Sequence, residues 1–296
     1  MGTAGAPVVL VHGSRTSRTM WRRQLEALSA AGVPAVAIDL PGHGTRRGER
    51  FTLDGAVGAV RDAVDAAGGR ALVVGLSLGG YVAIEHRARH PEQSAGLVAA
   101  SCSTVTSSQV RPAWLSLARW IERWPDSGAG LNGSLVRLAL DAESAQDMAA
   151  GGFALEVMSD VLRELAPADS LAALSATDSP VWVVNGRYDH FRTQERAFVA
   201  AARAGGAPVR LAVVPHARHL VSLDAPVAFS RAVLEAAAEA ARASGGREVP
   251  GAGAADEGRG VRHDDDVVAE PVESGGRDAA RVAAAEVEAV PAEHRP

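Results

Sequence analysis

The chain has 296 residues, of which 47% are hydrophobic and 22% are charged, and its formal net charge at pH 7 is −5. This length and composition are typical of a globular protein with a sizeable core. The acidic excess lies at the C-terminal end, where residues 244–296 hold 12 Asp and Glu against 6 Arg. The rest of the chain is therefore close to neutral, and neither a nucleic acid nor a membrane surface is expected as a partner.

Cysteine content and apolar runs indicate the compartment. Cys102 is the only cysteine, so an internal disulfide is impossible, and a reducing environment is the simpler assumption. The first residues lack the pattern of a signal peptide, and no apolar run is long enough to span a bilayer. We therefore expect a cytoplasmic protein.

The first predicted strand, residues 7–11, ends at His12-Gly13-Ser14. Glycine at this position lets the backbone turn so that the next N–H faces a reacting group, which makes the Ser14 N–H a candidate oxyanion donor. A simple strand-ending turn is the alternative. A helix over residues 20–31 and a strand over residues 35–40 follow, and we interpret His43, in the next loop, as structural.

A second helix is predicted over residues 51–68, followed by a buried strand, residues 71–74, and a helix over residues 82–89. Between the last two lies Gly75-Leu76-Ser77-Leu78-Gly79. A serine on so tight a strand-to-helix turn needs small residues two positions away on each side, because larger side chains would collide with the neighbouring backbone. Ser77 is therefore the candidate nucleophile, and the Leu78 N–H is a second candidate oxyanion donor.

A strand over residues 95–100 completes three alternations of strand and helix, which predict a parallel sheet covered on both faces. From residue 104 to 176 only helical patches appear, at residues 110–124, 134–141 and 152–165. An insertion at this edge of the sheet is interpreted as a helical lid. The apolar side chains expected to line a substrate pocket beneath it are Trp114, Trp120, Phe153 and Met158. Packing of the lid onto the body is the alternative role for each of them.

Strands return at residues 181–184 and 209–214, with helices at residues 193–204 and 226–242. Asp189 follows the first of these strands and His219 follows the second, so both are delivered to the edge of the sheet that carries Ser77. A serine needs a base to remove its proton, and the base needs an acid that fixes its tautomer. Ser77, His219 and Asp189 supply these roles. Rival bases and acids lie nearby: His190, His216, Asp178 and Asp224.

Together these residues resemble the α/β-hydrolase fold family, and within it the small lid-bearing serine hydrolases such as esterases and lactonases. The resemblance covers residues 7–242 and is carried by His12-Gly13, Asp39-Leu40-Pro41-Gly42-His43-Gly44, Gly75-Leu76-Ser77-Leu78-Gly79-Gly80, Asp189 and His219. It implies a Ser-His-Asp triad and an oxyanion hole formed by the Ser14 and Leu78 N–H groups.

Two features depart from the family pattern. Arg218 stands where the family usually has glycine before the catalytic histidine, which puts an arginine at the pocket mouth or shifts the loop. Too few residues precede the first strand for the family's two antiparallel strands, so we expect a sheet of about six parallel strands.

We expect an α/β-hydrolase core formed by residues 1–103 and 177–243, a helical lid over residues 104–176, and a disordered acidic tail over residues 244–296. The expected function is a serine hydrolase without cofactor or metal that acts on a small apolar ester or lactone. Thioester or carbon–carbon bond hydrolysis and a non-catalytic small-ligand receptor are the alternatives, whereas Ser77 disfavours reactions that need an aspartate nucleophile. Substrate identity and oligomeric state stay open at this stage.

Overall fold

The computed structural model describes residues 5–105, 116, 120, 123–124 and 129–245. Contacts divide the chain into two units, Met1–Glu248 and Val249–Pro296. The expected tail, apart from its first two residues, Trp114 and most of the helix predicted over residues 110–124 lie outside the described residues.

Six parallel strands form one sheet in the order β2-β1-β3-β4-β5-β6. Their bounds are β1 Val8–Val11, β2 Ala35–Ile38, β3 Ala71–Leu76, β4 Ser94–Ala100, β5 Val181–Gly186 and β6 Val209–Val214. Every neighbouring pair is parallel, so the carboxyl ends of all six strands meet at one edge. This confirms the predicted parallel sheet of about six strands, without antiparallel strands among the described residues.

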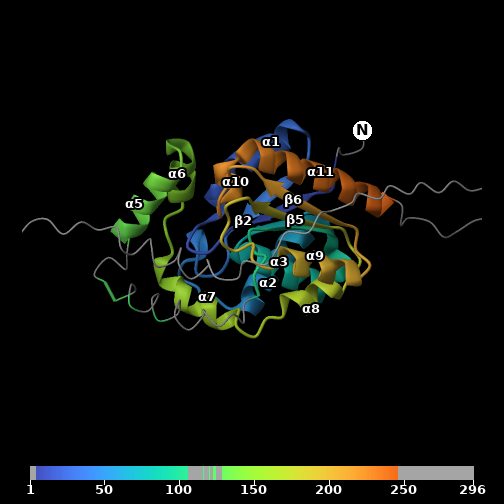
Figure 1. The fold of residues 1–296 in the computed structure, drawn as a ribbon, viewed down its shortest axis with the longest axis horizontal. Helices are drawn as coiled ribbons and strands as arrows, with labels where there is room; N and C mark the ends of the chain where they lie inside the picture. Colours follow the sequence, from blue (N-terminus) through green and yellow to red (C-terminus); the bar gives the residue numbers. More distant parts are fainter. Residues whose placement is uncertain (1–4, 106–115, 117–119, 121–122, 125–128, 246–296) are drawn as a thin grey trace, which may run out of the picture. The chain divides into compact units, whose positions relative to one another are not determined.

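Helices cover both faces of the sheet (Figure 1). One face carries α1 (Arg22–Ala30) and α11 (Pro226–Gly245), and the other carries α2 (Leu53–Ala66), α3 (Leu78–Arg89) and α9 (Glu195–Ala204). Alternate residues of each inner strand enter the two cores. In β1, for example, Val9 and Val11 pack on the side of α2, while Val8 and Leu10 pack on the side of α1.

Between β4 and β5 the described residues form four short α-helices: α5 Ala129–Ala139, α6 Ala142–Ala149, α7 Met158–Glu164 and α8 Ser170–Ser175. We call residues 129–175 the helical insertion. Two of them, α5 and α7, overlap the predicted helical patches, whereas α6 and α8 fall outside those patches and were not predicted. Figure 1 shows α8 beside α9. The helix α6 contacts the 3-10 turn Arg18–Trp21, which leads into α1.

Ion pairs attach the helical insertion to the body, with the arginine on the body and the carboxylate on the insertion. Arg22 of α1 pairs with Glu143 and Asp147 of α6, and Arg47 pairs with Glu156. Most of these groups are solvent-accessible, so the pairs orient the insertion more than they stabilise it. No helix within the described residues has the length and apolar character needed to cross a membrane.

Candidate active site

Ser77 occupies the sharp turn between β3 and α3. Its backbone lies in a conformation rare for L-residues, with φ 54° and ψ −116°. The flanking glycines permit this turn: a Cβ atom at Gly75 would lie 2.1 Å from the Gly79 carbonyl oxygen, and one at Gly79 would lie 2.2 Å from the Val11 carbonyl oxygen. The small residues thus do what the sequence pattern predicted, since any side chain there would overlap backbone atoms.

The structure brings Ser77, His219 and Asp189 together. His219 Nε2 lies 3.1 Å from Ser77 Oγ, and His219 Nδ1 lies 3.0 Å from Asp189 Oδ1. Because a carboxylate only accepts, Nδ1 carries the proton that is donated to Asp189, and Nε2 is left to accept from the serine hydroxyl. The Asp189 side chain is fully buried, whereas that of His219 is 21% exposed. In such a hydrogen-bonded chain a histidine is placed to accept a proton from the serine hydroxyl.

The environment of Asp189 keeps it ionised. Burial raises the pKa of its carboxyl, but hydrogen bonds from His219 and from the Phe191 N–H outweigh that effect, so the net pKa is below its ordinary value. The Ser101 hydroxyl also lowers this pKa. Ser101 follows β4 directly, has a φ of 52°, and was not singled out from the sequence. Its position at the same edge of the sheet was the signal that could have identified it.

The rival acids and bases take other positions. Asp224 accepts from the backbone N–H and from the guanidinium of Arg218, at 2.7 and 2.8 Å. His216 is exposed at a φ of 59°, and the His190 ring lies beside that of His219 with centroids 5.1 Å apart. The charge of Asp178 acts on Arg87. None of the four makes a hydrogen bond to Ser77 or His219 among those found in the described residues.

Arg218 is exposed and belongs to the loop that carries His219. Besides Asp224, its guanidinium binds the carbonyl oxygen of Ala139, the last residue of α5. The arginine that departs from the family pattern therefore connects the histidine loop to the helical insertion.

Of the two expected oxyanion donors, Leu78 directly follows Ser77, and Ser14 directly follows Gly13. Gly13 lies against the turn that carries Ser77, which we call the elbow, since a Cβ atom at Gly13 would be 3.6 Å from the Ser77 Cβ. Within the described residues, neither the Ser14 N–H nor the Leu78 N–H donates to a protein acceptor. Leu78 also begins α3, where unpaired N–H groups and the helix dipole favour negative charge. The arrangement suits an oxyanion, although its role stays a prediction.

His12 and His43 are fully buried and structural in their contacts. His12 donates from Nδ1 to the Gly13 carbonyl and accepts from the Leu40 N–H at Nε2. Burial lowers the pKa of His12 to about 3 and also lowers that of His43, whose Nδ1 donates to the Pro41 carbonyl. Both rings are therefore neutral at physiological pH, and His12 fixes the loop that carries Ser14.

The residues expected to line a substrate pocket differ in their exposure and in their contacts. Trp120 is 54% exposed and packs edge-on against Trp124. Phe153 is half-buried against the core on the side of α1, and Met158 is half-buried at the start of α7. The described contacts of Trp120 and Phe153 are with other side chains of the protein, so a binding role for these residues and for Trp114 stays a prediction.

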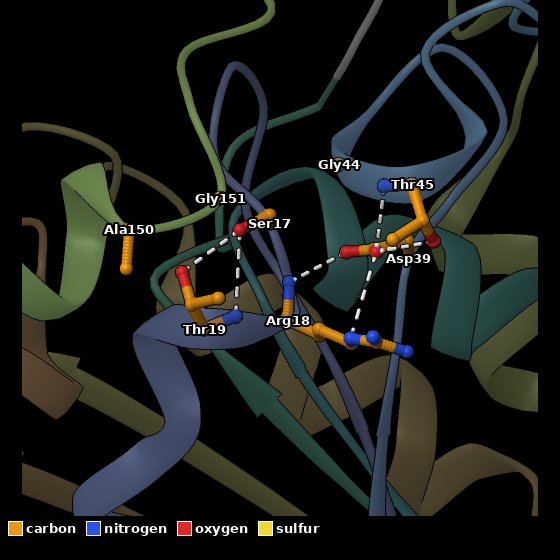
Figure 2. Close-up of a pocket in the computed structure, with 8 residues that line it drawn as sticks. All are labelled: Ser17, Arg18, Thr19, Asp39, Gly44, Thr45, Ala150 and Gly151. Carbon is orange, nitrogen blue, oxygen red and sulfur yellow. Dashed lines mark hydrogen bonds and ion pairs between the residues drawn. The ribbon is translucent and has the colours of Figure 1, made fainter.

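A separate recess of about 320 Å³ lies where the loop after β1 meets the loop after β2 and the end of α6 (Figure 2). Its walls are formed by Ser17, Arg18, Thr19, Asp39, Gly44, Thr45, Ala150 and Gly151. The Asp39 carboxylate already accepts from the Arg18 N–H and from the N–H and hydroxyl of Thr45. Gly44 allows its backbone to lie close to the Asp39 carboxylate, because a Cβ atom at Gly44 would lie 2.4 Å from that carboxylate. The recess contains none of the triad residues, and its polar groups hold the two loops together.

No group of three or more His, Cys, Asp or Glu side chains in the described part of the chain is arranged to hold a metal ion. Cys102 is buried, which raises the pKa of its thiol well above the ordinary value, and its Sγ lies against Gly80. It therefore has neither the exposure nor the ionisation of a nucleophile.

A family model of the alpha/beta hydrolase family matches residues 8–232. The chain belongs to the alpha/beta hydrolase family. The chain is similar to a pimeloyl-[acyl-carrier protein] methyl ester esterase of Neisseria meningitidis serogroup B, with 29% identity over 244 residues that span 78% of this chain and 92% of the relative. The family assignment confirms the resemblance predicted from the sequence.

The chain spans less than half of the length of several other curated relatives that it matches. It is 38% identical to epoxide hydrolase B of Mycobacterium tuberculosis over 102 residues, which are 33% of this chain and 29% of that protein. Among solved structures, the enol-lactonase of Burkholderia xenovorans shares the fold, with a TM-score of 0.62 and 21% identity over 78% of this chain and 91% of the lactonase. These relatives agree on a hydrolase and differ in the bond that is cleaved.

Proposed function

We propose that this hydrolase cleaves a small carboxylic ester or lactone through a covalent acyl-enzyme, with Ser77 as nucleophile, His219 as general base and acid, and Asp189 as the orienting acid. The observation that carries the proposal is the hydrogen-bonded chain from Ser77 Oγ through His219 to the buried Asp189 carboxylate. No cofactor enters the reaction.

The proposed reaction has two halves. Ser77 Oγ attacks the carbonyl carbon while its proton passes to His219 Nε2, and the carbonyl oxygen becomes an oxyanion held by the Ser14 and Leu78 N–H groups. His219 then gives that proton to the departing alkoxide, and the acyl group remains on Ser77. Water, deprotonated by His219, attacks the acyl-enzyme, and collapse of the second intermediate releases the acid and returns the proton to Ser77.

Asp189 supports both halves. It accepts the Nδ1 proton of His219, which holds Nε2 toward the serine, and its negative charge stabilises the imidazolium that forms during each proton transfer. The lowered pKa of Asp189 keeps this charge available throughout the physiological range.

Among the reactions named for the relatives, ester and lactone hydrolysis fit this arrangement best. Epoxide opening in this fold needs an aspartate nucleophile, and the elbow carries Ser77. The esterase of Neisseria meningitidis, whose match covers 92% of its length, supports ester hydrolysis. Thioesters and cleavable carbon–carbon bonds use the same triad and are the alternative substrates.

The test is hydrolysis of 4-nitrophenyl acyl esters of increasing chain length, together with labelling by a fluorophosphonate probe. We expect turnover and labelling of the wild-type protein, and loss of both in Ser77→Ala. Folded wild-type protein that neither turns over any ester nor takes up the probe would refute the serine-hydrolase proposal.

A further inference from the structure

Two buried side chains donate to one carbonyl oxygen in the loop after β1. The Nδ1 atom of His12 lies 2.8 Å from the Gly13 carbonyl oxygen, and the Thr16 hydroxyl lies 2.9 Å from the same oxygen. Both His12 and Thr16 are buried, so water does not compete for these contacts. A carbonyl oxygen has two lone pairs, and these two donors occupy both of them.

The protons of both contacts are directed at this carbonyl. His12 Nε2 accepts from the Leu40 N–H, so the ring proton is on Nδ1 and is donated to Gly13. The Thr16 hydroxyl has one proton and a second acceptor within reach, the Met20 sulfur at 3.3 Å. Because a thioether is a weak acceptor and the carbonyl is a strong one, the hydroxyl proton goes to Gly13.

The Gly13 carbonyl and the Ser14 N–H belong to one peptide unit. This peptide is trans, as are the others among the described residues, so its C=O and N–H bonds point in opposite directions within one plane. Holding the carbonyl therefore also fixes the direction of the N–H. Within the described part of the chain, the Ser14 N–H donates to no protein acceptor, which leaves it available for a ligand.

This peptide belongs to a loop that is packed against the elbow. A Cβ atom at Gly13 would lie 3.6 Å from the Ser77 Cβ and 3.3 Å from the end of the Leu76 side chain. At the start of α3, a Cβ atom at Gly79 would lie 2.6 Å from the His12 carbonyl oxygen. Backbone atoms of the loop and the elbow are therefore in close contact, and a rotation of the Gly13–Ser14 peptide would change what the N–H offers beside Ser77.

We propose that Thr16 is a positioning residue of this hydrolase, whose hydroxyl holds and polarises the Gly13–Ser14 peptide so that the Ser14 N–H receives the oxyanion. The inference rests on the proposed serine-hydrolase function. A carbonyl that accepts hydrogen bonds makes the N–H of its own peptide a stronger donor, because hydrogen bonds in a chain polarise one another. This benefit grows as negative charge develops on the substrate oxygen, so it lowers the reaction barrier more than it strengthens substrate binding.

The test compares Thr16→Val, which keeps the branched shape and removes the hydroxyl, with Thr16→Ser, which keeps the hydroxyl. With the 4-nitrophenyl ester that the wild-type protein cleaves most efficiently, kcat of Thr16→Val is expected to fall about 3- to 10-fold with little change in KM, the effect of one neutral hydrogen bond. Thr16→Ser should restore most of this loss. Thr52→Val is the matched control, since it removes the hydroxyl that accepts from the Gly55 N–H at the start of α2; it should lose stability and keep kcat.

Two further readouts separate positioning from a structural role. An alkyl trifluoromethyl ketone adds to Ser77 as an oxyanion, so its inhibition constant should rise in Thr16→Val by the factor by which kcat falls. The amide nitrogen NMR resonance of Ser14 responds to hydrogen bonding at the preceding carbonyl. It should shift in Thr16→Val and shift much less in Thr16→Ser.

The outcomes distinguish this proposal from the proposed function. An unchanged kcat in folded Thr16→Val, a loss that Thr16→Ser does not restore, or an unshifted Ser14 amide in Thr16→Val would each overturn the positioning role. The amide measurement needs no turnover, so it tests the contact by itself. Wild-type protein that neither cleaves an ester nor takes up the fluorophosphonate probe would instead refute the serine-hydrolase function.

Discussion

Gly186, the last residue of β5, lies directly under the loop that carries His219. A Cβ atom at Gly186 would be 2.2 Å from the Arg218 carbonyl oxygen and 2.5 Å from that of Ala217. These are backbone atoms, so no side-chain rotation relieves the overlap. In Gly186→Ala the His219 loop must move away by about 1 Å to reach an ordinary van der Waals separation.

This displacement acts on the triad. The 3.1 Å and 3.0 Å contacts of His219 would both be lost or misaligned, because Asp189 stays with β5 while the histidine loop moves. A misplacement of about 1 Å costs about 100-fold in rate, so kcat of Gly186→Ala is expected to fall by that factor with a smaller change in KM. Overpacking is also expected to destabilise the fold by about 1–3 kcal/mol.

The assay is steady-state hydrolysis of the 4-nitrophenyl ester that the wild-type protein cleaves most efficiently. Thermal unfolding shows at which temperatures each variant is folded, so that the rates are compared between folded proteins. Gly58→Ala is the matched control, since a Cβ atom at Gly58 in α2 meets nothing within 4 Å. This control should keep wild-type activity and gain up to about 1 kcal/mol of stability. Folded Gly186→Ala with kcat within about threefold of the wild type would contradict the expected 100-fold effect of a 1 Å misplacement.

Three other consequences are open to measurement. His12 has a pKa of about 3 when folded and about 6.5 when unfolded, so the unfolded state binds more protons between these pH values. The free energy of unfolding should therefore fall as the pH drops below about 6.5. Denaturant titrations at about pH 7 and about pH 4.5 should show a smaller fall in His12→Gln than in the wild type, and an equal fall would contradict this. Arg218→Ala removes the contacts to Asp224 and the Ala139 carbonyl, so we expect a several-fold lower kcat that Arg218→Lys partly restores; wild-type kinetics in Arg218→Ala would show that these contacts do not position His219. Cys102 should react with a thiol reagent at pH 8 only when the protein unfolds, because the thiol is buried; reaction of native protein at the rate of a free thiol would disprove this.

The alternation of strands and helices was predictable because the strands are short, mainly apolar runs and helices such as α1, α2 and α9 have a regular apolar face. The elbow was predictable for a stricter reason: the clashes at Gly75 and Gly79 leave few sequences that can form it. The short helices α6, α8 and α10 (Val221–Asp224) were missed, since four to eight residues carry little periodicity.

The choice of partners within the site depended on tertiary contacts. Asp189 and Asp224 both follow the last strands, and what separates them is that Arg218 engages Asp224 with its backbone and side chain. The effect of Ser101 on Asp189 comes from a neighbouring strand far away in the sequence.

The parallel sheet also sets the order in which the protein acquires activity. Ser77 and His219 are separated by 142 residues, and β1 pairs with β2 and β3, each through a crossover. Such non-local pairings fold slowly, because the chain must close long loops before the contacts form. A fragment that ends before β6 would contain Ser77 without His219, so we expect any recovery of the proposed activity during refolding to require the last strand.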